Sequence, residues 1–558
     1  MRTKPETTKM LFLTGCILIV TIAMVLLVTS LGFFMDQKVS AWQFPVSLIF
    51  TSAIFYFTGK TWYHQEFVFI KSFFLSIGLI LISLLIAISF YDITYDGQSY
   101  HMEGIYQLKN GWNPFNATLP DSVNMALYVN HYAKGVELPQ STLYSLTNRI
   151  ESGKATNLIL LFGVSCLTTA YLFSLGRLST VKSLLISSIA VLNPVILNQL
   201  LSTYVDGQLA ILLLGFFVCA LWIIREPQTL NLILLAAVIL ITVNIKFTGL
   251  VYAVIFTLAL LAWLLFVKKR PLFTKVICTT MFAGIIGTCV IGYNPYIVNT
   301  IKFQHPFYPL MGKNKVDIMT HNMPDGFESK GELDKFMISL FAHSDNVMTG
   351  NQKTIGLKLP FTFNKTDVVG SYQVDTRIAG FGAFFSGIII LAIVLLLAAL
   401  WQSYQGEITL NPANWLYVIG VIALSVIIIP EAWWARYVPQ LWYTPLLVLL
   451  MTELNATGKF KTIKAVIYFA FLFDIIFMLF GIRYNLLMTN QINAQMKELK
   501  GLKEPLEVEW GSARINRVRF SENQIPYKET DLSKRAGIQS IICSDSKFIL
   551  PNKTRNDQ

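Results

Sequence analysis

Two aspartates stand four residues apart at the end of a long apolar run, Asp92 and Asp96. A charge beside hydrocarbon costs on the order of 3 kcal/mol, so carboxylates at such a position are candidates for a function. A carboxylate that is partly shielded from water has a raised pKa and can take a proton from a hydroxyl group. The pair therefore predicts a general base, although both side chains can instead cap the helix that follows.

A histidine and a lysine follow in the same polar stretch, His131 and Lys134. Both side chains donate hydrogen bonds and can carry a positive charge, which suits a phosphate group. A solvated loop explains the same two residues without any ligand. The spacing therefore leaves a phosphate site and an ordinary loop as alternatives.

Further charged residues occur where later apolar runs begin or end. Asp206 precedes one run, Lys246 lies at the junction of two, and Arg436 follows Glu431 between two more. A planar guanidinium can bind a phosphate through two parallel hydrogen bonds, which makes Arg436 the foremost cation of this group. The structural alternatives are a lysine that extends its charge to water and an Arg436–Glu431 ion pair.

The composition indicates that membrane helices must position these residues. Hydrophobic residues make up 54% of the 558 residues, charged residues make up 14%, and the mean hydropathy is +0.55. Soluble proteins carry roughly 25% charged residues. The formal net charge is +12. Many of the cations lie in short connections between apolar runs, where they determine topology, so the charge does not indicate a nucleic-acid partner.

The lengths of the apolar runs predict an all-α polytopic membrane fold. A helix of about 20 apolar residues crosses the roughly 30 Å hydrocarbon core of a bilayer. On this criterion the sequence contains about 13 transmembrane helices, at residues 10–34, 42–59, 67–91, 155–175, 183–203, 207–225, 229–245, 249–267, 276–297, 379–401, 413–430, 437–453 and 463–483.

The basic residues of the short connections predict the orientation, because lysine and arginine are enriched on the cytoplasmic side of a membrane. With a cytoplasmic N-terminus, the opposite side holds Lys38, Lys246 and Arg436 in its short connections. The cytoplasmic side then holds Arg2, Lys4, Lys9, Lys60, Arg177, Lys182, Arg225, Lys268, Lys269, Arg270, Lys275, Lys459, Lys461 and Lys464. We therefore expect a multi-pass protein of the cell (plasma) membrane with its long polar segments on the extracytoplasmic side.

This topology divides the chain into six regions. They are N-terminal transmembrane helices at 1–91, a first large extracytoplasmic loop with the candidate aspartates at 92–154, transmembrane helices at 155–297, a second extracytoplasmic loop at 298–378, C-terminal transmembrane helices at 379–483, and a small C-terminal polar domain at 484–558. Alternating residues around Glu507 and Ile538 predict short strands in the last region. The division brings Asp96, Lys246 and Arg436 to one face of the membrane from separate helices.

Several short segments on that face carry a resemblance to a known family. They are Tyr95–His101, Asn130–Gly135, Lys246–Gly249, Asn294–Tyr296 and Trp434–Tyr437. The chain resembles the GT-C superfamily of membrane glycosyltransferases, in particular its bacterial cell-envelope members, over roughly residues 67–453. That superfamily has many helices, an aspartate at the start of its first large outer loop, and sugar donors carried on polyprenyl phosphate.

The resemblance implies a role for each candidate residue. Asp96, whose Asp-Gly-x-x-Tyr-His context fits the family better than that of Asp92, would be the base that activates an acceptor hydroxyl. Two more helices precede this loop than in the family, so Asp92 stays an alternative. The cations implied to bind the leaving lipid phosphate are Arg436, Lys246, Lys134 and His131. The residues implied to contact the substrates are His101, Tyr100, Asp206, Glu431 and Asn294.

The resemblance also implies the partners of the reaction. These are a polyprenyl-phosphate-linked sugar donor, membrane lipid, and a glycan, lipid or protein acceptor. No cofactor is required, because the lipid phosphate is already a good leaving anion. A divalent metal, held by Asp92 and Asp96, is the one cofactor that the residues leave open, although the sequence contains no closed set of metal ligands.

Two other functions fit a polytopic chain of this kind. A polysaccharide polymerase of the O-antigen or capsule type joins lipid-linked glycans on the same face, and an essential Arg377 in the second loop would favour it. A lipid-glycan transporter or flippase makes no bonds, and it would place charged residues along a path inside the helices. The cations considered above lie at helix ends instead.

Overall fold

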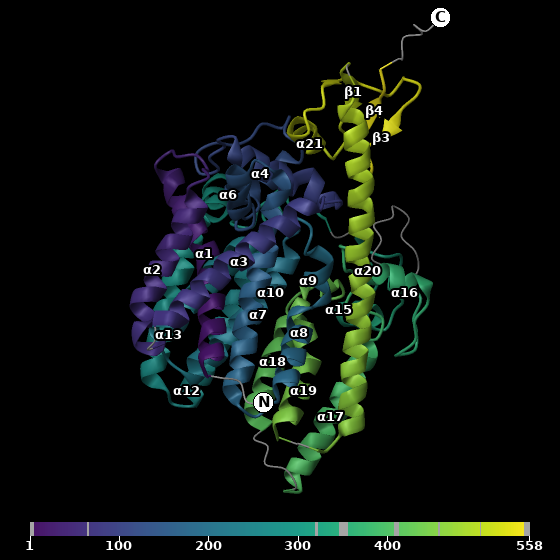
Figure 1. Ribbon diagram of the computed structural model, residues 1–558. Coiled ribbons are helices and arrows are strands. Elements are labelled where there is room, and N and C mark those ends of the chain that lie inside the picture. Colours follow the sequence, from purple (N-terminus) through teal and green to yellow (C-terminus); the bar gives the residue numbers. More distant parts are fainter. Residues whose placement is uncertain are drawn as a thin grey trace, which may run out of the picture.

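The computed structural model describes residues 5–63, 66–318, 322–344, 355–406, 412–455, 458–502 and 504–551. Helices dominate these ranges, in which the only strands are four short ones near the C-terminus. The long helices run roughly parallel, and the short helices α4 (Met102–Lys109) and α6 (Glu137–Thr147) lie over one end of them (Figure 1). The chain is thus a helical bundle with a cap of short helices.

One group of long helices is built around the N-terminal helix. The buried helix α1 (Pro5–Phe34) packs against α7 (Ala155–Leu175), α2 (Gln43–Tyr63), α3 (Glu66–Ser89) and α11 (Thr229–Ile245). The neighbouring helices of this group are α10 (Asp206–Arg225), α12 (Phe247–Phe266) and α13 (Arg270–Ile286), which continues into π-helical turns at Gly287–Ile291 and Tyr293–Ile297.

The remaining longer helices pack beside this group, with α8 (Thr180–Val191) against α7 and α9 (Pro194–Gln199) against α10. The others are α17 (Phe385–Tyr404), α18 (Pro412–Ile427), α19 (Tyr443–Asn455) and α20 (Lys461–Lys500). The short elements are α5 (Ala126–His131), α14 (Val298–Phe303), α15 (Glu332–Leu340), α16 (Lys365–Ser371) and α21 (Asn516–Glu522), with π or 3-10 turns at Gly97–His101, Ile150–Lys154, Ala435–Tyr437 and Pro439–Trp442.

Eight helices of the described residues are long and apolar enough to cross a membrane, judged by length and composition. They begin at Pro5, Glu66, Ile150, Asp206, Phe247, Arg270, Phe385 and Lys461. Three shorter apolar helices, α8, α11 and α18, add to them. The protein therefore has the all-α, many-helix build of a polytopic membrane protein, whereas the expected number of about 13 crossings exceeds the eight that meet these limits.

Several of the expected spans differ from the structure, and two differ most clearly. Residues 183–203 do not form one helix, because α8 ends at Val191 and a new helix starts at Pro194. The Asn193 side chain accepts a hydrogen bond from the backbone N–H of Val195, at 3.0 Å, and so caps that new helix. The helix expected to end at residue 483 continues to Lys500.

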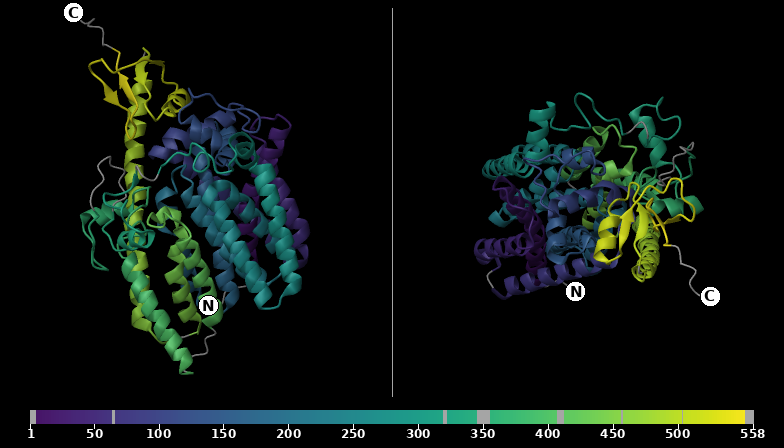
Figure 2. Two further views of the ribbon diagram at one scale, coloured as in Figure 1. Left: turned by 180° about the vertical axis from the view of Figure 1, so that it is seen from behind. Right: turned by 90° about the horizontal axis from the view of Figure 1, so that it is seen from above.

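The helix α20 carries the chain away from the bundle. Its 40 residues correspond to a length of about 60 Å, twice the thickness of the hydrocarbon core. Both side views show it along one flank, with the strands beyond its end (Figures 1 and 2). Those strands, β1 (Leu506–Glu509), β2 (Tyr527–Glu529), β3 (Gln539–Ser540) and β4 (Lys547–Ile549), form a sheet in the order β2-β1-β4-β3. The expected strands near Glu507 and Ile538 thus correspond to β1 and β3.

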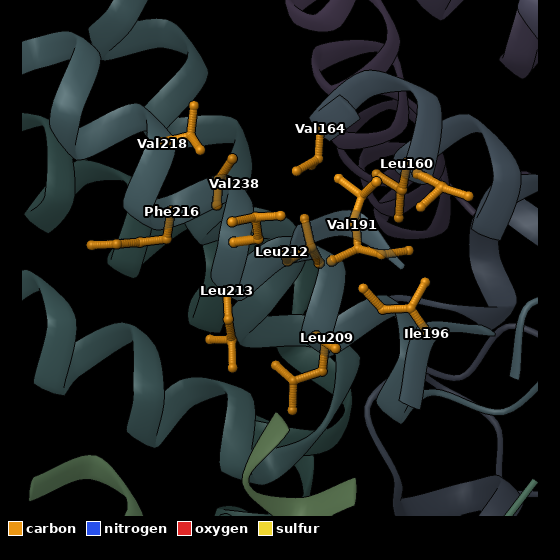
Figure 3. Close-up of a cluster of buried hydrophobic side chains, with 14 of the residues drawn as sticks. Leu160, Val164, Val191, Ile196, Leu209, Leu212, Leu213, Phe216, Val218 and Val238 are labelled. Carbon is orange, nitrogen blue, oxygen red and sulfur yellow. The ribbon is translucent and has the colours of Figure 1, made fainter. Parts of the chain in front are cut away.

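The core of the bundle is filled by aliphatic side chains from several helices. Figure 3 shows Leu160 and Val164 of α7 facing Leu212 of α10, with Val191 and Ile196 from α8 and α9 beside them. All five are buried. The outer faces are apolar as well, as at Phe74 and Leu85 on α3 or Phe282 on α13. Apolar side chains on both the inner and the outer faces are what a helix bundle in lipid requires.

The crossing of α1 and α7 depends on two glycines. A Cβ atom at Gly15 would lie 2.7 Å from the backbone oxygen of Gly163 and 2.6 Å from Cγ of Leu167. We expect Gly15→Ala to lower the free energy of unfolding by about 1–3 kcal/mol, because the two helices must separate. The melting temperature of the detergent-purified protein would fall accordingly. Gly78→Ala on α3 is the matched control, since a Cβ atom there meets nothing within 4 Å; equal melting of the two variants would contradict the expectation.

Candidate functional site

A cavity of about 240 Å³ lies where six parts of the chain meet at the capped end of the bundle. These parts are the chain after α3, the region of α5, the start of α10, the junction of α11 and α12, the second long loop, and the segment between α18 and α19. Its charged lining residues are Asp96, His101, Glu137, Asp206, Lys246, Asp375, Arg377 and Arg436. Its aromatic lining residues are Tyr95, Tyr100, Tyr128, Tyr132, Tyr204, Phe247, Trp434 and Tyr437. We call this space the charged cavity.

Asp92 anchors the segment that carries Asp96. Its Oδ1 accepts hydrogen bonds from the backbone N–H and the hydroxyl of Thr94, at 2.9 and 2.6 Å. Its Oδ2 accepts two more from the N–H and the hydroxyl of Thr203, at 2.7 and 2.8 Å. The side chain is fully buried. Four donors satisfy this carboxylate, so Asp92 joins the end of α3 to the start of α10 and does not line the charged cavity.

A glycine lets the chain turn tightly after this anchor. A Cβ atom at Gly97 would lie 2.3 Å from Oδ2 of Asp92 and 2.5 Å from the Thr94 hydroxyl. The backbone can therefore pass directly over the Asp92 carboxylate only because residue 97 has no side chain. This passage turns Asp96 toward the charged cavity at the start of the π-helical turn Gly97–His101.

Asp96 is the aspartate of the cavity whose nearest cation is the most distant. Its closest cation is Arg436, whose Nη1 lies 3.9 Å from Oδ2, and 21% of its side chain is exposed. Burial raises the pKa of Asp96; Arg436 opposes this effect, and the carboxylates of Asp375 and Asp206 add to it. A weakly paired carboxylate with a raised pKa is suited to accepting a proton.

Arg436 lies at the centre of an ion network. Its Nη1 contacts Oδ1 of Asp375 at 2.9 Å, and its Nε lies 3.7 Å from Oδ2 of Asp206. Burial alone would lower the pKa of the Arg436 guanidinium, but these two carboxylates hold it well above its usual value. The buried Nε donates no hydrogen bond to any described residue. The guanidinium centre lies 4.5 Å from the Trp434 ring centre, which fixes its plane.

Two neighbouring cations complete the network. Lys246 donates to Oδ1 of Asp206 at 2.8 Å, and its Nζ lies 3.9 Å from the ring centre of Tyr437. Arg377 pairs with Asp375. Its guanidinium centre lies 4.4 Å from the Trp434 ring centre. The three cations therefore gather around two carboxylates on one side of the charged cavity.

Backbone hydrogen bonds hold the two segments that supply these arginines together. The N–H of Arg436 donates to the carbonyl of Thr376, and the N–H of Ala435 donates to that of Arg377, both at 3.1 Å. The Trp434 indole N–H donates to the carbonyl of Asp375 at 2.9 Å. The second long loop thus reaches the charged cavity because it pairs with the segment between α18 and α19.

The structure brings six of the predicted site residues to the charged cavity. They are Asp96, Tyr100, His101, Asp206, Lys246 and Arg436. The ring centres of Tyr100 and His101 lie 4.2 Å apart. The His101 Nδ1 lies 2.8 Å from Oε1 of Glu137. That carboxylate therefore orients the imidazole toward the aromatic wall of the cavity.

His131 and Lys134 lie away from the cavity lining. The Nδ1 of His131 lies 2.9 Å from Oδ1 of Asn299, and its ring packs edge-to-face on Phe303 and Tyr308. Lys134 is buried and donates to the carbonyl of Tyr132. Burial lowers the pKa of Lys134 to about 8. These contacts explain both residues as parts of the packing of the first loop. Their position does not support a role in phosphate binding.

Asn294 and Glu431 also lie outside the charged cavity. The Asn294 amide donates to the carbonyl of Pro114 at 2.8 Å and ties α13 to the first loop. Glu431 begins the turn before Trp434, whose backbone N–H donates to its carbonyl at 2.9 Å. The closest carboxylates of Arg436 are Asp375 and Asp206, so the expected Arg436–Glu431 pair is not formed within the described residues.

The sequence did not predict that Asp375 pairs with Arg436. Nothing in its local pattern distinguishes it from other acidic residues of the second loop. The one available signal is its position two residues before Arg377. A carboxylate and a cation this close in the chain can belong to one ion network if the fold buries both. Tyr204 was missed for a similar reason, because an isolated tyrosine near a helix end is common at membrane interfaces.

The donor set does not fit a divalent metal. All four hydrogen bonds to the Asp92 carboxylate come from threonines, so Asp92 is not free to hold a metal ion together with Asp96. Across the ranges that the structure describes, no group of three or more His, Cys, Asp or Glu side chains is arranged to hold a metal ion.

The chain matches no protein-family model, no curated protein and no solved structure.

Proposed function

We propose that the protein is a membrane glycosyltransferase that moves a sugar from a polyprenyl-phosphate donor to an acceptor hydroxyl in the charged cavity. The observation that carries this proposal is the difference between the cavity carboxylates. Asp206 and Asp375 each have a cation at 2.8–2.9 Å, whereas the nearest cation to Asp96 lies at 3.9 Å. Asp96 is therefore the carboxylate that can take a proton without breaking a short ion pair.

The proposed location follows from the helices and the basic residues. We propose about thirteen crossings of the plasma membrane, with a cytoplasmic N-terminus and the charged cavity on the extracytoplasmic side. The distribution of lysine and arginine in the short connections supports this orientation, because most of them lie at the end of the helices away from Asp96. An extracytoplasmic site is where a sugar carried by a lipid could meet an envelope glycan, lipid or protein acceptor.

The proposed reaction is a direct displacement. The acceptor hydroxyl gives its proton to Asp96 while its oxygen forms a bond to the anomeric carbon of the donor sugar. The bond between that carbon and the phosphate oxygen breaks, and its electron pair stays on the phosphate. Arg436 and Lys246 stabilise the charge that develops there, and Asp206 and Asp375 hold both cations in place.

One donor of Arg436 is left without a close acceptor in the ion network. The Nε–H of Arg436 is buried and has no hydrogen-bond acceptor among the described residues. An unsatisfied buried donor costs free energy, and an anionic ligand would remove that cost. The aromatic residues that surround the cations lower the local dielectric constant, which strengthens the effect of these cations on a developing charge.

The direct test is transfer of a labelled sugar from polyprenyl-phosphate donors by purified protein in liposomes. We expect Arg436→Lys to lower kcat/KM by about 10- to 100-fold, because lysine keeps the charge but loses the planar fork. Arg149→Lys is the matched control; Arg149 is 51% exposed and lies outside the cavity. Equal kcat/KM for the wild type and Arg436→Lys would remove Arg436 from the proposed donor site.

A polysaccharide polymerase is the second candidate, because Arg377 lines the same cavity and packs on the same indole ring as Arg436. The products distinguish the two enzymes: a single added sugar supports the glycosyltransferase, and a ladder of repeat units supports the polymerase. A transporter would move the labelled lipid across the bilayer without breaking its sugar–phosphate bond.

A further inference from the structure

We infer that a second cavity beside the charged one binds the acceptor, and that this acceptor is a neutral, hydroxyl-rich carbohydrate; the inference rests on the proposed function. The second cavity, here called the side cavity, has a volume of about 300 Å³. Its walls come from the chain after α3, the end of α9, the segment before Arg377, and the middle of α20. A cavity of this size can hold one or two sugar rings, in line with the usual dimensions of small-ligand sites.

The two cavities share a wall. Tyr95, Tyr204 and Asp375 line both of them. Tyr95 precedes Asp96 in the chain, and the Tyr204 ring centre lies 5.5 Å from the Arg436 guanidinium. A molecule in the side cavity would therefore have one end beside the proposed base and the proposed phosphate site. This is the position that an attacking hydroxyl needs.

The polar lining of the side cavity is almost entirely neutral. Amide and hydroxyl groups come from Asn198, Ser202, Gln373, Tyr372, Tyr484 and Asn485. Asp375 is the one charged residue among the described lining residues, and Arg436 and Arg377 already balance it. A phosphate in this space would meet no cation of its own. Groups that both donate and accept hydrogen bonds suit sugar hydroxyls instead.

One of these amides is held with an unused acceptor. The Nδ2 of Asn198 donates to the carbonyl of Ser371 at 2.9 Å, which fixes the orientation of the amide. Its Oδ1 is buried and receives no hydrogen bond from the described residues. Buried amide oxygens are normally paired. Because Asn198 lines the side cavity, a ligand there that donates a hydrogen bond could pair this oxygen after a small shift of the neighbouring side chains. A sugar hydroxyl can supply that donor.

The kinetic test separates the two substrates. We expect Asn198→Leu, which keeps the shape of the side chain, to raise KM for the acceptor by about tenfold and to leave KM for the lipid-linked donor unchanged. Asn110→Leu is the matched control on the exposed surface of the first loop. A change in the donor KM, or no change in either KM, would overturn the inference while transfer by the wild type still supports the proposed function.

A binding test does not depend on turnover or on the folding of a variant. Cys543 lines the side cavity, so its alkylation by a maleimide reports on access to that space. We expect at least one member of a panel of neutral mono- and disaccharides to slow alkylation of Cys543 several-fold in the wild type, as measured by mass spectrometry of the modified peptide. Alkylation of the unfolded protein in denaturant is the control, because the cavity no longer exists there; Cys278 and Cys289 lie in the membrane-spanning helix that begins at Arg270 and do not serve as controls.

The same measurement includes the outcomes that contradict the inference. Protection of Cys543 by inorganic phosphate or by polyprenyl phosphate would make the side cavity part of the donor path. Alkylation at the same rate with every sugar of the panel, together with an unchanged acceptor KM for Asn198→Leu, would also overturn it. Absence of any sugar transfer by the wild type would instead reject the proposed function.

Discussion

Asp96→Asn should lower kcat for sugar transfer by about 10²- to 10⁴-fold, the usual contribution of a general base. Asparagine keeps the size of the side chain but is neutral and cannot accept a proton. Because Asp96 forms no short ion pair, its contact with Arg436 being 3.9 Å, the variant should fold and melt as the wild type does. The rates should be compared at saturating donor, with melting curves measured on the same preparations.

The pH dependence gives a second readout of the same residue. A base must be deprotonated to act, so the rate of the wild type should rise as the pH increases through the pKa of Asp96. Burial raises that pKa above the ordinary value of an aspartate, which moves this limb of the profile to higher pH. The residual rate of Asp96→Asn should lack the limb altogether.

Asp92→Asn is the matched control for this prediction. It replaces one of two oxygens that accept hydrogen bonds from Thr94 and Thr203, so we expect a lower melting temperature. The transfer rate of the folded Asp92→Asn protein should still rise with pH as in the wild type, because Asp92 does not line the charged cavity. The assignment of the base would have to move to Asp92 if Asp92→Asn removed the limb while Asp96→Asn retained it.

Arg519→Met should destabilise the protein by about 3–5 kcal/mol, because it leaves a buried carboxylate without one of its partners. Arg519 is 3% exposed and comes from α21, in the C-terminal segment. Its Nη2 and Nε contact Oε1 of Glu151 at 2.6 and 3.0 Å. Lys154, at 2.5 Å from Oε2 of Glu151, would be the main remaining cation, which places the expected loss near the lower end of the range.

The same arginine holds the segment that carries the proposed base. Its Nη2 donates to the carbonyl of Asp92 at 2.7 Å, and its Nη1 donates to the side chain of Gln98 at 3.1 Å. These contacts lie on both sides of Asp96 in the chain. We therefore expect Arg519→Met to reduce transfer more than its fraction of unfolded protein explains, and to make the C-terminal segment accessible to protease.

Arg535→Met is the control for this second prediction. Arg535 is 56% exposed and pairs with Glu507 at 3.4 Å, and exposed pairs of this kind contribute about 0–1 kcal/mol. Melting temperature, protease sensitivity and transfer rate should all stay close to those of the wild type. Docking of α21 onto the first loop would be contradicted if Arg519→Met and Arg535→Met melted and were cleaved alike.

The sequence by itself determined the helical build of the protein. The requirement for about 20 apolar residues is local, so α1, α3, α10 and α12 begin and end within about five residues of their predicted spans. The break at Pro194 could also have been predicted from the sequence, because a proline has no backbone N–H and disfavours helical geometry in the residue before it. The length of α20 was missed, since residues 484–500 are polar and their helix is stabilised by contacts with the C-terminal sheet.

The sequence also determined which end of the helices carries the charged residues. Asp96, Asp206, Lys246 and Arg436 all lie next to helix ends, and regular crossing brings alternate ends to one side. This reasoning predicts on which side of the bundle a residue lies. It does not predict which side chains on that side contact each other. His131 and Lys134 share the region of these residues, yet their contacts lie outside the cavity.

Only the tertiary structure decided which of these residues meet. The Asp92 carboxylate is occupied by Thr203 of a distant helix end, which separates it from Asp96. Asp375 reaches Arg436 because the second long loop pairs with the backbone after Trp434. Contacts between residues far apart in the chain depend on how whole helices pack, and they leave no periodic pattern in the sequence. The charged residues at the helix ends are thus visible in the sequence, whereas the choice of Asp96 as the weakly paired carboxylate is a result of packing.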